Sequence, residues 1–509
     1  MSITSFYFLC FFAGILIIYY SIPKRWQWGF LLFCSAAYFL FTNNGGLILY
    51  PFLSVAVCHF GIRAMTKTEE ERKKKTALAA VLIVNLGILF FLKYINFGIH
   101  TVNGIAGIFG VSEPVLQGFH FPVPLGVSFY TFSLLGYVID AYYGIAKPQT
   151  NPLKLALYGM YFPAMISGPI LQYRECGEQF FAAHAFDYHK VTRGIQRMLW
   201  GLFKKLVIAE RLRVLVDTVY GQYSDYPGAY IWIATICYAF QLYTDFSGCM
   251  DIVLGMSESL GLTLPENFQT PFFAKSVAEY WRRWHITLGV WMKEYVFYPL
   301  LRSRFFTGLN KSWKQKFGKK RGKQYATFAA MFILWFTVGV WHGGEWKYVI
   351  GSGLLHWFYI VMEELLEPPC ARFMEKIHIN AKGKFIGGIR ILRTFLLVCI
   401  GDLFFRADSL GAAFAMLKGA VTVWNPGILW NGALTELGLD VIEIAITVFS
   451  LLLLLLVSCL QQNGSVRDRI AKKSLPVRWL VWYALLFGVI LFGCYGPEYS
   501  AAEFIYQGF

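Results

Sequence analysis

The stretch Met331-Phe332-Ile333-Leu334-Trp335-Phe336-Thr337-Val338-Gly339-Val340 is apolar and leads directly into Trp341-His342-Gly343-Gly344. A straight helix over residues 325–342 carries His342 roughly 27 Å from the first residue of the helix, at about 1.5 Å per residue. An ionisable group at membrane depth is costly and usually faces a cavity or a partner. The glycines that follow let the chain turn and let another group approach closely. His342 is thus either a functional residue or a core imidazole bonded to a neighbouring carbonyl group.

The rest of the chain has the composition of a polytopic membrane protein. Its 509 residues are 57% hydrophobic, 18% aromatic and only 15% charged, with a mean hydropathy of +0.49. Apolar runs long enough to span hydrocarbon recur from end to end, which predicts one large all-α domain instead of several soluble ones. Spans are expected near 5–22, 28–42, 46–65, 77–97, 123–143, 153–172, 192–212, 229–247, 325–342, 349–364, 390–406, 442–460 and 479–496.

The net charge of +16 is concentrated in short segments between these spans. Basic residues in short loops mark the cytoplasmic side of a membrane protein, and anionic headgroups attract them. The basic segments Lys24–Arg25, Lys67–Lys75, 305–324 and 461–478 place the N-terminus outside and the tail Tyr495–Phe509 outside. The first 22 residues lack a basic start and a cleavage site, so they are predicted to be a span. Nucleic-acid binding is not expected, because no aromatic stacking platform accompanies the charge.

Other chemistries lack their motifs in this chain. The ten cysteines are scattered and unpaired in spacing, which predicts neither disulfides nor metal ligation. There is no His-Glu-x-x-His, which argues against a metal site, and no Gly-x-Ser-x-Gly, which argues against a serine hydrolase.

A second histidine lies in a segment that does not read as a simple span. Residues 248–300 mix apolar with charged and proline residues, which predicts a re-entrant or interfacial arrangement. Within 277–296, apolar and aromatic residues recur at three- and four-residue steps and predict one helix with a broad apolar face. Arg282, His285 and Lys293 fall outside that face. By spacing alone this is an interfacial helix whose basic residues meet headgroups, and the alternative is a catalytic helix.

Several motifs in a fixed order resemble the membrane-bound O-acyltransferases, in particular their bacterial branch that serves alginate O-acetylation. Trp281-Arg282-Arg283-Trp284-His285-Ile286-Thr287-Leu288 and Trp341-His342-Gly343 carry the resemblance. Other matching stretches are 124–132, 137–140, 162–163, 167–170, 201–205, 245–248, 264–268 and 404–409. The motifs lie within about 124–409 and are followed by C-terminal spans and a tail over 441–509.

The resemblance implies a ring of about 11–13 transmembrane helices around a central funnel or tunnel, with re-entrant or interfacial helices. It implies acyl transfer from a cytoplasmic thioester, with acetyl-CoA as the expected donor substrate and no bound cofactor or metal. The acceptor would be a cell-surface or exported polysaccharide, and an extracytoplasmic SGNH-type transferase the expected partner. The chain would lie in the bacterial cell membrane with both termini outside.

The resemblance also assigns roles to residues. His342 corresponds to the catalytic base and His285 to its supporting partner, because a neutral imidazole can take a proton from an attacking hydroxyl. Tyr506, in an aromatic C-terminal motif, would relay the acyl group, or would simply anchor the tail at the interface. Donor or substrate contacts are expected from Arg282, Arg283, Trp281, Trp341, Asn267 and Asp245.

Two other functions remain open from the sequence. One is D-alanyl transfer to teichoic acid from a carrier-protein thioester, although such relatives are usually shorter. The other is a transporter or flippase with a polar pathway, which commonly shows two related halves. No convincing internal repeat is present.

Overall fold

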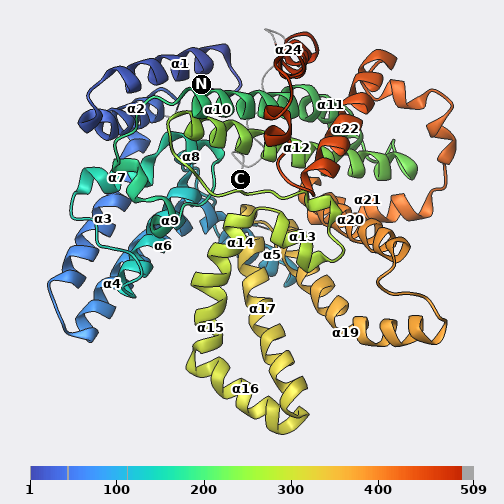
Figure 1. The fold of residues 1–509 in the computed structure, drawn as a ribbon. Coiled ribbons are helices and arrows are strands. Elements are labelled where there is room, and N and C mark those ends of the chain that lie inside the picture. Colours follow the sequence, from blue (N-terminus) through green and yellow to red (C-terminus); the bar gives the residue numbers. More distant parts are fainter. Residues whose placement is uncertain (1, 43–44, 112, 496–509) are drawn as a thin grey trace. The chain divides into compact units, whose positions relative to one another are not determined.

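The computed structural model describes residues 2–42, 45–111 and 113–495, which form helices joined by loops, with no strand among them. The predicted all-α class is therefore confirmed. One isolated antiparallel bridge joins Phe268 to Trp284. The helices are α1 Phe6–Ser21, α2 Gln27–Thr42, α3 Leu49–Thr66, α4 Glu71–Leu89, α5 Ile95–Ile108, α6 Val127–Tyr142, α7 Pro152–Met160, α8 Phe162–Ser167, α9 Tyr173–Cys176, α10 Tyr188–Leu202, α11 Glu210–Gly221 and α12 Ala229–Ser259. They continue with α13 Val277–Arg283, α14 Ile286–Met292, α15 Tyr298–Arg302, α16 Arg304–Phe317, α17 Lys319–Gly343, α18 Trp346–Tyr348, α19 Leu355–Lys376, α20 Lys384–Arg406, α21 Leu410–Thr422, α22 Val441–Gln461, α23 Val466–Ala471 and α24 Leu475–Phe492 (Figure 1).

Six of the described helical stretches are long and apolar enough to cross a membrane. They are Gly45–Thr66, Glu71–Ile108, Lys319–Gly343, Trp346–Lys376, Val441–Gln461 and Leu475–Phe492. Large apolar side chains on them are exposed, such as Phe449 at 67% and Leu480 at 70%. Apolar surface of this extent is stable only against lipid or another protein. The chain is therefore a multi-pass membrane protein, as predicted.

Some predicted spans differ from the helices observed. The span predicted at 153–172 is broken into α7 and α8 at Tyr161, and neither helix is long enough to cross hydrocarbon. Pro163 sits in the first turn of α8, where its missing N–H costs nothing. The same proline cannot continue α7, because it has no N–H to donate to that helix. The basic segment predicted as a loop over 305–324 is instead a helical hairpin made of α16 and the start of α17.

The chain forms two compact units that interleave along the sequence. The first contains the described residues up to Phe203, together with Phe246–Pro265 and Tyr495. The second contains Lys204–Asp245 and Glu266–Cys494.

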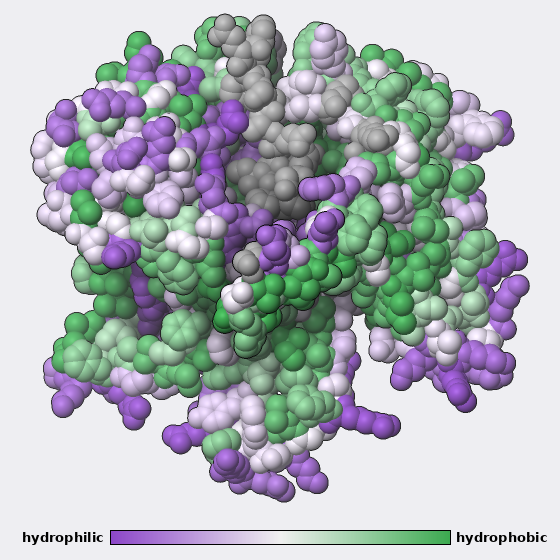
Figure 2. Space-filling model, turned by 180° about the vertical axis from the view of Figure 1, so that it is seen from behind, coloured by the Kyte–Doolittle hydropathy of each residue, from purple (hydrophilic) through white to green (hydrophobic). Residues whose placement is uncertain are grey.

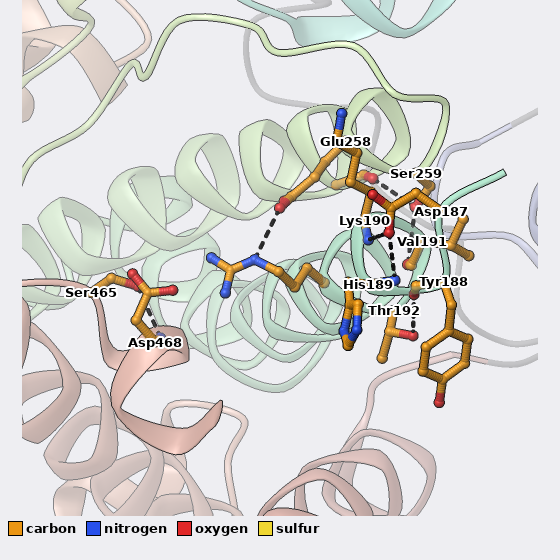
Figure 3. A network of polar contacts seen from close by, with 12 residues as sticks. Asp187, Tyr188, His189, Lys190, Val191, Thr192, Glu258, Ser259, Ser465 and Asp468 are labelled. Atoms are coloured by element: carbon orange, nitrogen blue, oxygen red, sulfur yellow. Dashed lines mark hydrogen bonds and ion pairs between the residues drawn. The ribbon is translucent and has the colours of Figure 1, made fainter. Parts of the chain in front are cut away.

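In the first unit, α10 and residues 246–259 of α12 approach at small residues. A Cβ added to Gly255 would lie 2.5 Å from the Gly194 carbonyl oxygen, so the two backbones touch there. Ion pairs flank this contact, with Arg197 Nε 2.9 Å from Asp251 and Arg193 Nε 3.4 Å from Glu258. Figure 3 shows the start of α10, where Asp187 caps the helix by accepting the backbone N–H groups of His189 and Lys190, beside Glu258 and Ser259.

In the second unit, α16 folds back on α17 (Figure 1). Gly322 makes this possible, because a Cβ there would collide with the backbone at Trp313 and Lys314. Hydrophilic residues gather at the end of this hairpin, at the bottom of Figure 2. Residues 295–344 contain basic side chains and no Asp or Glu. The other end of α17 carries His342.

Candidate active site

The end of α17 holds His342 in place. The imidazole is 2% exposed and lies one residue before the end of the helix. Gly344 ends α17 with a left-handed backbone, φ +63°, and donates its N–H to the Val340 carbonyl. A Cβ on Gly343 would collide with the ring of Tyr348. The predicted roles of the two glycines, a turn and a close approach, are confirmed.

His285 interrupts the helix that the sequence predicts over 277–296. The chain forms α13 up to Arg283 and restarts as α14 at Ile286, and His285 between them has φ +46° and ψ +50°. A left-handed backbone at a residue other than glycine costs on the order of 1–3 kcal/mol and persists only where the surroundings impose it. The single-helix prediction was therefore wrong here, and the break turns the imidazole into the protein interior, where it is 1% exposed.

Asn267 imposes this conformation. Its backbone carbonyl accepts the N–H of Ile286 at 3.1 Å. Its side-chain oxygen accepts both the N–H and the hydroxyl of Thr287 at 3.0 Å and lies 3.4 Å from His285 Nδ1. Since that oxygen is an acceptor, Nδ1 must be the protonated ring nitrogen and Nε2 carries the lone pair. Asn267, predicted as a substrate contact, thus orients His285.

Trp341 joins the two histidines. The centroid of its ring lies 5.6 Å from that of His285 and 5.1 Å from that of His342. On its other side, the His342 ring meets Phe405 edge-on at 5.4 Å. We call His285, Trp341, His342 and Phe405 the histidine cluster. The structure thus brings the two histidine motifs, 57 residues apart in the chain, against one buried indole.

The surroundings keep His285 neutral. Burial lowers the pKa of its imidazole from 6.5 to about 3, because a charged ring loses its hydration in a low-dielectric interior. A neutral imidazole can accept a proton. This is the protonation state that base catalysis requires.

The predicted arginines lie at the surface of this region. Arg282 is exposed. Arg283 pairs with Glu279 at 2.7 Å and donates to the Thr270 hydroxyl at 3.2 Å. Although burial raises the pKa of Glu279, the N–H of Lys275 and the guanidinium of Arg283 lower it overall. Both arginines remain candidates for donor contacts, with Arg283 already held by a carboxylate.

Asp245 belongs to a separate buried group that the sequence did not reveal. Lys205 pairs with Asp245 and, at 2.8 Å, with Glu210, and all three side chains are at most 5% exposed. We call Lys205, Glu210 and Asp245 the ion cluster. In the sequence Lys205 is only part of the matching stretch 201–205, and no local pattern signals that it meets two carboxylates. Trp281, predicted as a donor or substrate contact, packs on Trp335 and His356.

Tyr506 lies outside the described residues. Among the residues that are described, no three His, Cys, Asp or Glu side chains group as a metal site would. All ten cysteines are free thiols.

Comparison with known proteins identifies the family of this chain. The model of the membrane-bound O-acyltransferase family, MBOAT, matches residues 146–401, which include His285 and His342. The chain is 30% identical over 448 residues to the probable alginate O-acetylase AlgI of Pseudomonas aeruginosa, covering 87% of this chain and 79% of that protein. The chain belongs to the membrane-bound O-acyltransferase family.

Two further relatives show the range of the family. The peptidoglycan O-acetyltransferase of Helicobacter pylori is 28% identical over 430 residues, covering 78% of this chain and 74% of that protein. The teichoic acid D-alanyltransferase of Bacillus subtilis is 28% identical over 291 residues, covering 55% and 68%. The protein is thus an O-acyltransferase of the AlgI-like branch, as its motifs predicted. The predicted ring of helices and central funnel stay predictions.

Proposed function

We propose that this enzyme moves an acetyl group from a cytoplasmic thioester, acetyl-CoA, across the membrane for O-acetylation of a cell-surface or exported polysaccharide. The observation that carries the proposal is the contact of His285 and His342 with the same buried indole, Trp341. The relatives named for O-acetyl transfer align with 87% and 78% of the chain. The proposed orientation places the basic end of α17 in the cytoplasm and both termini outside.

The chemistry follows from a neutral imidazole. The hydroxyl oxygen of the acceptor attacks the thioester carbonyl carbon while His342 removes the hydroxyl proton. The carbon–sulfur bond then breaks, and the imidazolium returns the proton to the departing thiolate. The aromatic rings of Trp341 and Phe405 exclude water from His342, which favours transfer to the acceptor over hydrolysis. His285, oriented by Asn267, positions the reactants or shares the proton.

The test is the His342→Ala variant, with ester content of the surface polysaccharide and membrane abundance measured together. Ester loss at normal abundance supports the proposal, and unchanged ester content contradicts it. His100→Ala is the matched control, because His100 is exposed in α5. That control should retain both ester content and abundance.

D-alanyl transfer is a second candidate, favoured by the likeness to a teichoic acid D-alanyltransferase over 291 residues. The two candidates differ in the ester that they make. Mild alkaline release from cells that express the enzyme should yield acetate under the first proposal and D-alanine under the second. The transporter alternative does not survive the family assignment.

The tail supplies the remaining step of the proposal. Tyr506 would accept the acyl group outside and pass it to an SGNH-type partner. In this step the phenol oxygen bonds to the acyl carbon as the carbon–sulfur bond breaks and the phenol proton passes to the thiolate. The partner then transfers the acyl group from the phenol oxygen to the acceptor hydroxyl, and the phenol regains a proton. Tyr506→Phe should abolish acetylation of the outer acceptor. Undiminished acetylation in that variant removes the relay and leaves the tyrosine as an interfacial anchor.

A further inference from the structure

Another buried histidine packs against the helix that carries His342. His356, in the first turn of α19, is 3% exposed and sits among aromatic rings. Its ring centroid lies 5.1 Å from that of Trp281, with the planes nearly perpendicular, and 5.9 Å from that of Trp335. A Cβ on Gly401 would lie 2.7 Å from His356 Nε2, so α20 approaches this imidazole at a glycine. We call Trp281, Trp335 and His356 the His356 cluster.

Two polar atoms of this cluster have no protein partner. Among the residues that the structure describes, no hydrogen-bonding group reaches His356 Nδ1 or Trp281 Nε1. Each such buried atom costs roughly 1–3 kcal/mol, so a histidine that served only packing would be expected to bond a nearby carbonyl. The indole N–H can only donate, and a neutral imidazole nitrogen can accept. The two atoms, on rings in contact, match one group that both accepts and donates.

The cluster occupies a definite position relative to His342. Trp335 is seven residues before His342 on α17, which is about two turns and about 10 Å along the same face. Trp281 is four residues before His285. Tryptophan rings thus lie beside both histidines: Trp341 beside His342, and Trp281 and Trp335 beside His356. The His356 level lies nearer the basic end of α17, which is the side from which the proposed donor arrives.

We propose that His356 and Trp281 form a subsite for the outer amide of a pantetheine-type thioester donor. An amide carbonyl accepts the indole N–H, and its N–H donates to His356 Nδ1, so a single group satisfies both atoms. In an extended pantetheine arm, the second amide lies on the order of 9 Å from the sulfur, with bonds of about 1.5 Å. That length matches the separation of the two levels. The inference rests on the proposed thioester chemistry and deepens it by naming the recognised part of the donor.

The experiment compares two thioesters that differ in this amide. S-acetylpantetheine carries both amides, and S-acetyl-N-acetylcysteamine ends after the first. Thiol release is measured in inside-out membrane vesicles that contain the full-length enzyme and its acceptor. The wild type should prefer S-acetylpantetheine in kcat/KM by about 5- to 10-fold per hydrogen bond. A wild type with no preference overturns the subsite without any substitution.

Variants then assign the preference to residues. Trp281→Phe keeps an aromatic ring and removes the N–H, so the preference should shrink by about 5- to 10-fold, mainly through KM. Trp335→Phe is the matched control, because it changes the neighbouring ring. It should lower the rates with S-acetylpantetheine and with S-acetyl-N-acetylcysteamine by the same factor. The inhibition constants of free pantetheine and of free N-acetylcysteamine are also compared, because the ratio of these two constants does not depend on turnover of either thiol.

The outcomes separate the two proposals. An unchanged preference in both Trp281→Phe and His356→Asn, at normal abundance, overturns the subsite while thioester chemistry stands. If the wild type accepts neither thioester nor acetyl-CoA, the proposed donor class is wrong and the subsite falls with it. If Trp281→Phe fails to accumulate in the membrane, the comparison of the two thioesters in the wild type still decides whether the second amide is recognised.

Discussion

The second unit holds two buried polar groups of opposite character. In the ion cluster, Lys205 is matched to the carboxylates of Glu210 and Asp245. In the histidine cluster, the neighbours of His342 are the rings of Trp341 and Phe405. Charges removed from water are tolerated when they are paired, and removal of one partner leaves the other charge uncompensated. A neutral imidazole can be buried at lower cost and still exchange a proton.

The two clusters are therefore expected to have different roles within the second unit, one structural and one catalytic. The ion cluster joins the π-helix Phe203–Ala209 and the start of α11 to α12, so its expected role is to hold helices together. The histidine cluster joins α14 to α17 through an indole, and its expected role is catalysis. Substitutions in the ion cluster should therefore lower stability, and those in the histidine cluster should lower activity.

The largest effect is expected from the two histidines. His342→Ala should reduce acyl transfer by about 10²- to 10⁴-fold, the usual contribution of general acid–base catalysis. Residues that act as a unit are non-additive, so adding His285→Asn should reduce the rate little further. Asparagine tolerates the left-handed backbone at 285, which keeps the fold intact. Steady-state rates of His342→Ala, His285→Asn and the double variant test this. If the loss in the double variant equals the product of the two single losses, the histidines act independently.

Removal of the cation should destabilise the ion cluster. Lys205→Met leaves two buried carboxylates without their common partner, at a cost of about 3–5 kcal/mol. Thermal unfolding in detergent should show a large loss of stability, which a concurrent Asp245→Asn should partly restore. Lys418→Met, at an exposed lysine of α21, is the control. A Lys205→Met protein that is stable but inactive would move the ion cluster from the structural to the catalytic class.

The packing behind His342 should be sensitive to a single methyl group. A Cβ on Gly339 would lie 2.6 Å from Val349 Cα, so Gly339→Ala must separate α17 from the turn Val349–Leu354. We expect a loss of about 1–3 kcal/mol together with reduced activity, because His342 moves with α17. Gly411→Ala should be harmless, since its Cβ would lie 3.8 Å from Ser409 Oγ. Equal unfolding temperatures for the two variants would contradict the close approach.

The smallest effect, for a change of one pH unit, is the acid dependence of stability contributed by His285. Its pKa is lowered in the folded state from 6.5 to about 3, so between these values the unfolded chain binds the proton and the folded chain does not. Stability should therefore fall as pH drops below 6.5, by at most about 1.4 kcal/mol per pH unit. His285→Asn should flatten this slope relative to the wild type in thermal unfolding series. Identical slopes would indicate that His285 is protonated or solvated in the folded protein.

Hydropathy and motif order were sufficient for the class of fold and for the two catalytic candidates. A span is a local property, because about 20 consecutive apolar residues decide it, so α17, α22 and α24 could be read from the sequence. The glycines after His342 could be read for the same reason, since a turn depends on neighbouring residues.

Other features depend on contacts between distant parts of the chain. The break at His285 was missed because periodicity over 277–296 continues through it, and only the bonds from Asn267 impose the left-handed backbone. The sequence alone determined that this protein is a helical membrane protein with two histidines worth testing. Only the tertiary structure decided that they share Trp341, that Lys205 pairs with two carboxylates, and that His356 packs on Trp335, two turns before His342 on α17. The contacts of His285 with Trp341, of Lys205 with Asp245 and of Trp335 with His356 join residues tens of positions apart, and local patterns carry no information about them.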